Sequence, residues 1–124
     1  MEEELSQLQK SIRRLLIKTG IRIDLDGFNY LAYAVEVAVN SAELANKLCD
    51  GLYECVAEKF NTKAHCVERS IRSAIGKAYL HRGLQVINKL YNAQILDEKK
   101  KPSSGKFIRA LANAYNLNLV DDMK

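Results

Sequence analysis

The chain has 124 residues, 48% of them hydrophobic, which is typical of one globular domain and argues against wholesale disorder. It has no tryptophan and only one proline, Pro102, so long helices with short connections are favoured over a turn-rich β sandwich. No apolar run approaches the roughly 20 residues that span a bilayer, and no signal peptide precedes the first predicted helix. We therefore expect a single cytoplasmic domain over residues 1–124, without a membrane partner.

The net charge of +4 is unevenly distributed along the chain. Residues 1–58 hold six basic and ten acidic groups, a net charge of −4. Residues 59–109 hold twelve basic and three acidic groups, a net charge of +9, and the remaining residues contribute −1. A basic second half favours a polyanionic partner such as nucleic acid, although basic faces that are merely solvated are also common.

The three cysteines, Cys49, Cys55 and Cys66, are an odd number without metal-type spacing, so we expect reduced thiols, no zinc and no other cofactor. His65 and Cys66 are the one adjacent pair that resembles a nucleophile with its base. Neighbours on a helix point about 100° apart, which does not suit that role. Since no Gly-rich phosphate loop or paired carboxylate motif appears either, we expect no enzyme.

In chain order, apolar residues at helical spacing predict a first helix over residues 2–19, which Gly20 ends. Residues 21–27 alternate apolar and polar side chains, but a lone strand has no partner here, so we expect an extended connector. The next helix, over residues 28–39 with Asp26 as its N-cap, is apolar nearly all round, which indicates a central, buried helix.

A further helix is predicted over residues 42–60, capped by Asn40 or Ser41 and divided or kinked at Asp50-Gly51. After a polar loop over residues 97–105, Ser103 or Ser104 caps a last helix with an apolar stripe. Together with the helix described next and a short one after it, the pattern predicts an all-α fold of about six helices.

The stretch FNTKAHCVERSIRSAIGKAYLHRG, residues 60–83, predicts a helix over about 62–82, with Thr62 capping its start and Gly83 ending it. One side is apolar, formed by Ala64, Val67, Ile71, Ala74, Ile75 and Ala78. The opposite side holds His65, Cys66, Arg69, Arg72, Ser73 and Gly76, with Glu68 at its border. Small residues around two arginines allow close approach to a flat or grooved partner. A short helix and a tight turn precede it, which indicates a helix-turn-helix.

At these residues the chain resembles a known family. LYECVAEKFNTKAHCVERSIRSAI, residues 52–75, is similar to the effector half of the stage-zero sporulation protein A family, the sporulation response regulators of endospore-forming bacteria. The runs KFNT, VER, IR and AI match the family position for position. Two outlying segments agree, GIRIDLDGFNYL at residues 20–31 and KKKPSSGKFIRALANAYNL at residues 99–117.

The resemblance implies sequence-specific binding of double-stranded DNA, with the recognition helix in the major groove. In the family three side chains of this helix read base edges, and the corresponding positions are Cys66, Glu68 and Arg69. The family has an arginine where Cys66 stands here. Arginine can bind guanine O6 and N7 and glutamate can accept from cytosine N4, but cysteine can do neither. Backbone contacts are expected from Thr62, Lys63, His65, Arg72, Ser73 and Lys106, and from the Lys99–Lys101 run.

Three alternatives stay open. The family's effector domain normally follows a receiver domain, for which 124 residues leave no room, so this is an excised domain or a freestanding relative. The family also contacts the RNA polymerase sigma subunit through the segment matching residues 84–93, so that subunit is a further candidate partner, as is a second copy of this chain on DNA. A rival hypothesis is a protein-interaction module that pairs with a full-length regulator or a sigma subunit without reading DNA.

Overall fold

The computed structural model describes residues 5–47 and 51–117, and within these ranges it is all-helical, which confirms the predicted fold class. The described ranges hold seven helices where about six were predicted, because the segment over residues 42–60, which was expected to be divided or kinked at Asp50-Gly51, forms two helices, the first ending at Ala45 and the second beginning at Tyr53. The helices are α1 (Gln7–Lys18), α2 (Asp26–Asn40), α3 (Ala42–Ala45), α4 (Tyr53–Phe60), α5 (Ala64–Leu80), α6 (Gly83–Tyr91) and α7 (Ser104–Asn116).

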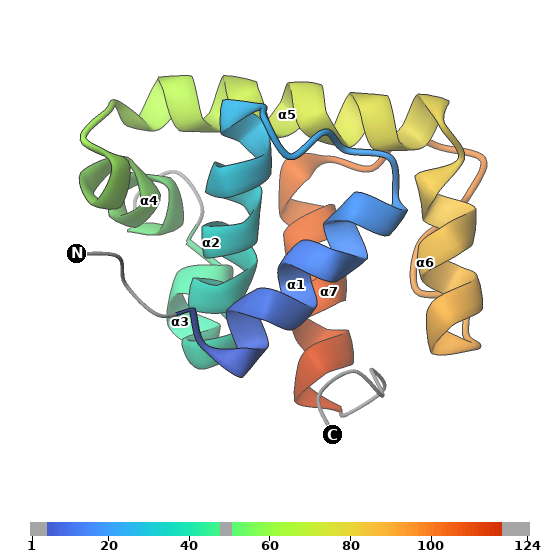
Figure 1. The fold of residues 1–124 in the computed structure, drawn as a ribbon. Coiled ribbons are helices and arrows are strands. Elements are labelled where there is room, and N and C mark those ends of the chain that lie inside the picture. The colour runs from blue at the N-terminus through green and yellow to red at the C-terminus, as the bar shows by residue number, and fades with distance from the viewer. Residues whose placement is uncertain (1–4, 48–50, 118–124) are drawn as a thin grey trace.

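Helix α5 lies across one edge of the molecule, with α4 beneath its first half and α6 beneath its end (Figure 1). Helix α2 runs through the centre and packs against α1, α3, α4, α5 and α7, as its nearly uniform apolar surface predicts. Phe28, Leu31 and Val35 of α2 are fully buried in a core to which all seven described helices contribute. The central helix therefore supports the outer one.

Local sequence signals set most of the helix ends. The hydroxyls of Ser41 and Ser103 accept the amides of Leu44 and Lys106 at the starts of α3 and α7, as predicted. Gly20, with φ 95°, follows the end of α1, also as predicted, and the connector after it contains no strand. The predicted cap at Asp26 is wrong. Asp26 is the first residue of α2, and the N-cap Leu25 has no side-chain oxygen to offer.

The close approach of α2 to α5 depends on Gly27. A Cβ atom at Gly27 would overlap the backbone carbonyl oxygen of Ser70 in α5 and lie 3.1 Å from the Ala74 Cβ. Its φ is unremarkable, so glycine is needed here for space rather than for backbone freedom. The start of α2 is thereby pressed against the middle of α5.

Two matched substitutions test this packing. We expect Gly27→Ala to lower the free energy of unfolding by about 1–3 kcal/mol, because the methyl group meets backbone atoms that cannot move aside. Gly76→Ala in α5 should instead raise it by about 0.5–1 kcal/mol, because its methyl group would meet only the flexible Lys101 side chain, at 3.3 Å. Urea unfolding of both variants measures the difference. Equal effects of the two substitutions would contradict the proposed close approach.

Candidate nucleic-acid interface

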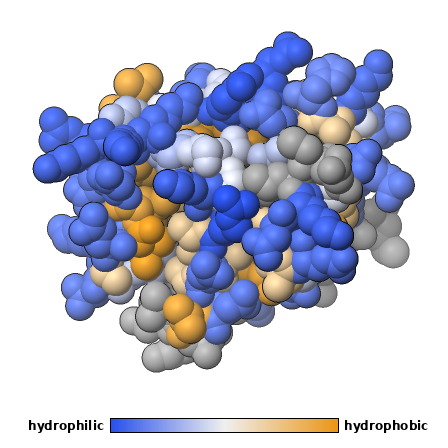
Figure 2. Space-filling model, turned by 180° about the vertical axis from the view of Figure 1, so that it is seen from behind, coloured by the Kyte–Doolittle hydropathy of each residue, from blue (hydrophilic) through white to orange (hydrophobic). Residues whose placement is uncertain are grey.

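The two faces predicted for α5 are confirmed. Its apolar side is buried against the core, except that Ala64 in the first turn is only half-buried. On the opposite side the predicted residues are exposed or half-buried, and seen from behind, the edge of the molecule along α5 is mainly hydrophilic (Figure 2). The exposed residues are His65, Arg69, Arg72 and Ser73, and the half-buried ones are Cys66, Glu68 and Gly76.

The start of α5 differs from the prediction. The helix begins at Ala64 rather than near residue 62, its N-cap is Lys63, and no side chain caps it, so Thr62 is not the cap. Thr62 instead lies in the turn after α4, where its amide donates to the Ala57 carbonyl at 2.9 Å. This bond follows Asn61, which has φ 56° and ends α4 in the left-handed conformation. A three-residue turn, Asn61–Lys63, therefore joins α4 to α5, and the two helices pack together.

The end of α5 also differs from the prediction. The helix ends at Leu80 with His81 as C-cap, and the left-handed residue is Arg82, with φ 60°. Gly83 does not end α5 but begins α6, where a Cβ atom would lie 2.5 Å from the Thr19 carbonyl oxygen. Glycine is thus needed at this position for the approach of α6 to the end of α1. The helix predicted to be the recognition helix over about 62–82 thus spans residues 64–80.

The exposed side of α5, with His65, Arg69, Arg72 and Ser73, forms a ridge. Glu68 and Arg69 lie on different flanks of this ridge. Glu68 forms an ion pair with Arg72, one turn further along α5, with 3.7 Å between Glu68 Oε2 and Arg72 Nη1. The Glu68 side chain is 32% exposed and the Arg72 side chain 58%. An exposed pair of this kind contributes little stability and is easily exchanged for another partner. Arg69 has no ion-pair partner among the described residues and lines a hollow of about 330 Å³ beside the start of α2, together with Asp26 and Ser73.

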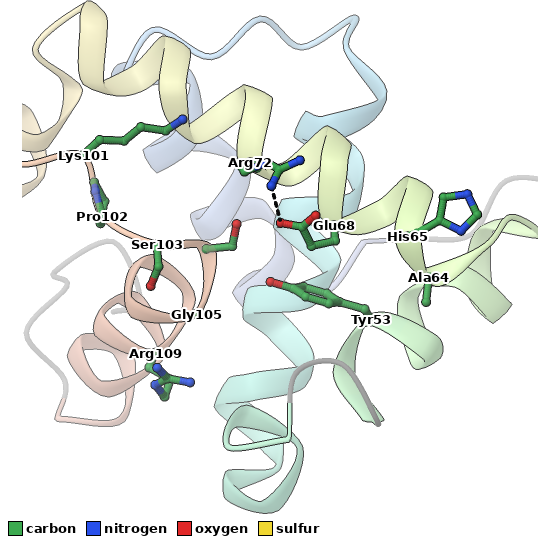
Figure 3. A pocket seen from close by; sticks show the side chains of 11 residues that line it. Tyr53, Ala64, His65, Glu68, Arg72, Lys101, Pro102, Ser103, Gly105 and Arg109 are labelled. Atoms are coloured by element: carbon green, nitrogen blue, oxygen red, sulfur yellow. Dashed lines mark ion pairs between the residues drawn. The ribbon is translucent and has the colours of Figure 1, made fainter.

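A larger cavity, of about 780 Å³, lies on the other flank, where α4 and α5 meet the start of α7 (Figure 3). It brings together His65, Glu68 and Arg72 with residues far away in the sequence. These are Tyr53, Ala64, Lys101, Pro102, Ser103, Ser104, Gly105 and Arg109. The sequence did not predict that Tyr53, Ser104 and Arg109 line one cavity. A capping signal at Ser103 or Ser104 locates the start of a helix, but it does not reveal which residues of other helices lie beside that start.

Lys101 links this cavity to the outer face of α5. Its Nζ lies 3.3 Å from the position that a Cβ atom of Gly76 would occupy, so the lysine side chain extends over α5. Lys106, predicted to contact the DNA backbone, is exposed in the first turn of α7 and lines a neighbouring cavity of about 580 Å³. Lys101 lines both cavities, so the two cavities adjoin at the loop before α7, and cationic side chains line each of them.

The buried side chain of Asn88 holds the loop that carries these lysines. Its Oδ1 accepts the amides of Ile95 and Leu96 at 2.7 and 3.0 Å. Its Nδ2 donates to the Leu96 carbonyl at 2.9 Å and to Glu98 Oε2 at 2.8 Å. One amide group in α6 therefore fixes the loop through four hydrogen bonds.

Of the two described cysteines, Cys66 lies on the exposed side of α5 and Cys55 lies in α4. Cys55 and Cys66 are half-buried free thiols, and Cys49 lies outside the described residues. Burial, and then the neighbouring Cys55, raise the pKa of the Tyr33 phenol. In residues 5–47 and 51–117 no three potential metal ligands come together. None of the helices in these ranges is long and apolar enough to cross a membrane.

The comparison with known families agrees with this geometry. A family model described as "Sporulation initiation factor Spo0A C terminal" matches residues 12–115 of the 124-residue chain. The match begins within α1, ends within α7 and includes every helix between them. The chain therefore belongs to this family of DNA-binding effector domains of sporulation regulators, and the resemblance seen in residues 52–75 is confirmed.

The hydrogen bonds of the Asn88 side chain to the loop before α7 give a testable prediction. Asn88→Ala leaves the Leu96 amide and carbonyl without their side-chain partner, so the free energy of unfolding should fall by about 2–3 kcal/mol. Amide hydrogen exchange should accelerate at Leu96 more than in α2. The exposed Asn113→Ala in α7 is the control, for which little change is expected. Unchanged protection of Leu96 in Asn88→Ala would show that the loop is held by other contacts.

Proposed function

We propose that this member of the family is a sequence-specific reader of double-stranded DNA that regulates transcription, with α5 in the major groove. The observation that carries the proposal is the combination of the family match with the exposed ridge of α5. An α-helix fits the major groove, and its side chains reach base edges only where its outer face is unobstructed. Helix α5 lies at an edge of the molecule with α4 packed behind its first half, which supports this docking.

Base reading is assigned to the first half of α5. Arg69 is exposed, has no ion-pair partner among the described residues, and can donate two hydrogen bonds to a guanine. Glu68 can accept from cytosine N4 once its weak pair with Arg72 opens. Cys66 lies in the same half of α5, but its side chain carries no charge and cannot donate a pair of hydrogen bonds to a base. The reader thus has two side chains suited to base recognition at its three expected positions.

Affinity is assigned to contacts with phosphates. Lys63 and His65 are exposed at the start of α5, Thr62 lies in the preceding turn, and Arg72 and Ser73 are exposed further along. Lys106 extends the same basic surface on α7. Such contacts neutralise phosphates whatever the sequence, so they supply binding strength and register rather than selectivity.

The other expected partners are proposed on the family resemblance alone. They are the sigma subunit, through residues 84–93, and a second copy on DNA. The competing function, a protein-interaction module that does not read DNA, is distinguished by salt. Contacts with about six phosphates should make the binding constant fall with about the fifth power of the salt concentration, whereas a helix-groove protein contact depends on salt far less.

Two arginines on the same helix should behave differently. We expect Arg69→Ala to lose about 1–3 kcal/mol of discrimination between a preferred and a scrambled operator, because the guanine contact is removed. Arg72→Ala should weaken binding to both operators alike and reduce the salt slope by about one. The preferred operator is first selected from random DNA with the wild-type chain, and fluorescence anisotropy then measures both variants at several salt concentrations.

Two results would contradict this assignment. Intact selectivity in Arg69→Ala would mean that α5 does not dock as proposed. No enrichment from random DNA, at low salt and high protein concentration, would support the protein-interaction module instead.

Restoring the family residue at position 66 is a complementary test. We expect Cys66→Arg to change the preferred base at about one operator position, because a bidentate donor is introduced on the reading face. Selection from random DNA, carried out in parallel for wild type and variant, measures the shift. Cys55→Arg in α4 is a charge-matched control that should leave the preferred sequence unchanged if the protein remains folded. Identical operators for wild type and Cys66→Arg would place position 66 outside the base contacts.

A further inference from the structure

The start of α7 presents unused hydrogen-bond donors to the large cavity beside α5. The hydroxyl of Ser103 accepts the amide of Lys106 at 3.2 Å, and the Ser103 carbonyl accepts that of Phe107 at 3.0 Å. The amides of Ser104 and Gly105 have no acceptor among the described residues. Free amides at the start of a helix carry partial positive charge and bind anions. Both residues line the cavity.

The Ser104 side chain is a second, independent indication. Ser104 is 8% exposed, and its Oγ is buried without a hydrogen-bond partner in the described part of the chain. A buried hydroxyl without a partner destabilises a fold, and such groups are uncommon in proteins. Ser104 lines the same cavity as the two free amides. Three donors of one short segment therefore lack acceptors at one place.

Charged side chains surround these donors with a net positive charge. Of the residues that line the cavity, Arg72, Lys101 and Arg109 are cationic and Glu68 is the single carboxylate. Arg109 Nη1 makes only a long bond, of 3.4 Å, to the Ala45 carbonyl. Arg72 is held by its exposed pair with Glu68, which an anion of higher charge can displace. Figure 3 shows the Arg72 and Glu68 side chains paired on α5 at the side of the cavity.

We propose that this cavity binds a phosphate group, held by the Ser104 and Gly105 amides and the Ser104 hydroxyl, with Arg72 and Lys101 as counter-charges. Binding draws Arg72 away from Glu68 and leaves the Glu68 carboxylate available to a base. A volume of about 780 Å³ exceeds one phosphate, so the group enters with the chain or sugar to which it is attached. Tyr53 and Pro102 form apolar walls for that part.

The phosphate has two possible sources. One is the DNA backbone beside the major groove, and this source rests on the proposed function. The other is a free phosphate or phosphomonoester that would link a small molecule to DNA reading through Arg72. The chemistry of the site is the same for both sources, and the experiments below separate them.

The first experiment titrates the full chain with inorganic phosphate and follows the backbone amides by NMR, with chloride held constant. We expect saturable shifts of the Ser104 and Gly105 amides. The amides of Ala42 and Glu43 are the internal control, because α3 also begins after a capping serine, Ser41, but its first turn carries the acidic Glu43. Shifts that rise linearly, or equally at both helix starts, would overturn the proposal.

The second experiment compares variants. Ser104→Ala removes a hydroxyl that has no partner in the described chain, so the melting temperature should not fall, whereas phosphate affinity should drop about tenfold. Lys101→Ala should weaken phosphate binding severalfold by removing one counter-charge. Lys10→Ala removes an equal charge on the distant, exposed side of α1 and should change nothing. Wild-type affinity in both Ser104→Ala and Lys101→Ala would overturn the proposal.

The third experiment identifies the source with DNA duplexes that carry one neutral methylphosphonate at successive positions. A position that weakens wild-type binding but not Ser104→Ala binding is the DNA phosphate that occupies the cavity. If no position is coupled to Ser104 while inorganic phosphate still binds saturably, the site takes a free phosphate. Failure of operator selection together with saturable phosphate binding would reject the proposed DNA reading and retain the site.

Discussion

The contact of Gly27 with the Ser70 backbone determines how α5 lies on the rest of the molecule. Because no side chain separates the two helices there, the apolar side of α5 reaches the core residues of α2 directly. The opposite side then faces outward, with His65, Arg69, Arg72 and Ser73 exposed. An unobstructed ridge is what entry into a DNA groove requires. One glycine in the central helix thus connects the core to the proposed reading surface.

The two flanks of this ridge differ because different helix starts meet them. On the Arg69 side lies the start of α2, whose positive end is offset by the Asp26 carboxylate. On the Glu68 side lies the start of α7, which follows a lysine run and has no acidic residue in its first turn. Three cationic side chains, Arg72, Lys101 and Arg109, therefore line the cavity on this flank, against Arg69 and Lys77 on the other. Asn88 fixes the loop that carries the lysines.

Local patterns in the sequence predicted where the helices lie, but not all of their ends and not the cavity beside α5. The 3.6-residue period of α5 and the serine caps predicted which residues face the core and where α3 and α7 begin. The roles of Gly27 and Gly83 depend on backbone atoms of distant segments, so no pattern along the chain reveals them. The same holds for Ser104, which reads as a cap candidate and instead lines the cavity beside α5.

The arrangement changes what the cysteine at position 66 means for the proposed reader. Two side chains suited to base recognition remain, and each can discriminate between bases by about 1–3 kcal/mol. The cationic side chains that line the cavity beside α5 are Arg72, Lys101 and Arg109. The balance between phosphate and base contacts is therefore shifted toward phosphates. Under that balance, Arg72 has the most consequential position, because it can pair either with a phosphate or with Glu68. A phosphate at the start of α7 would thus decide both how firmly the helix is seated and whether its one carboxylate can read a base.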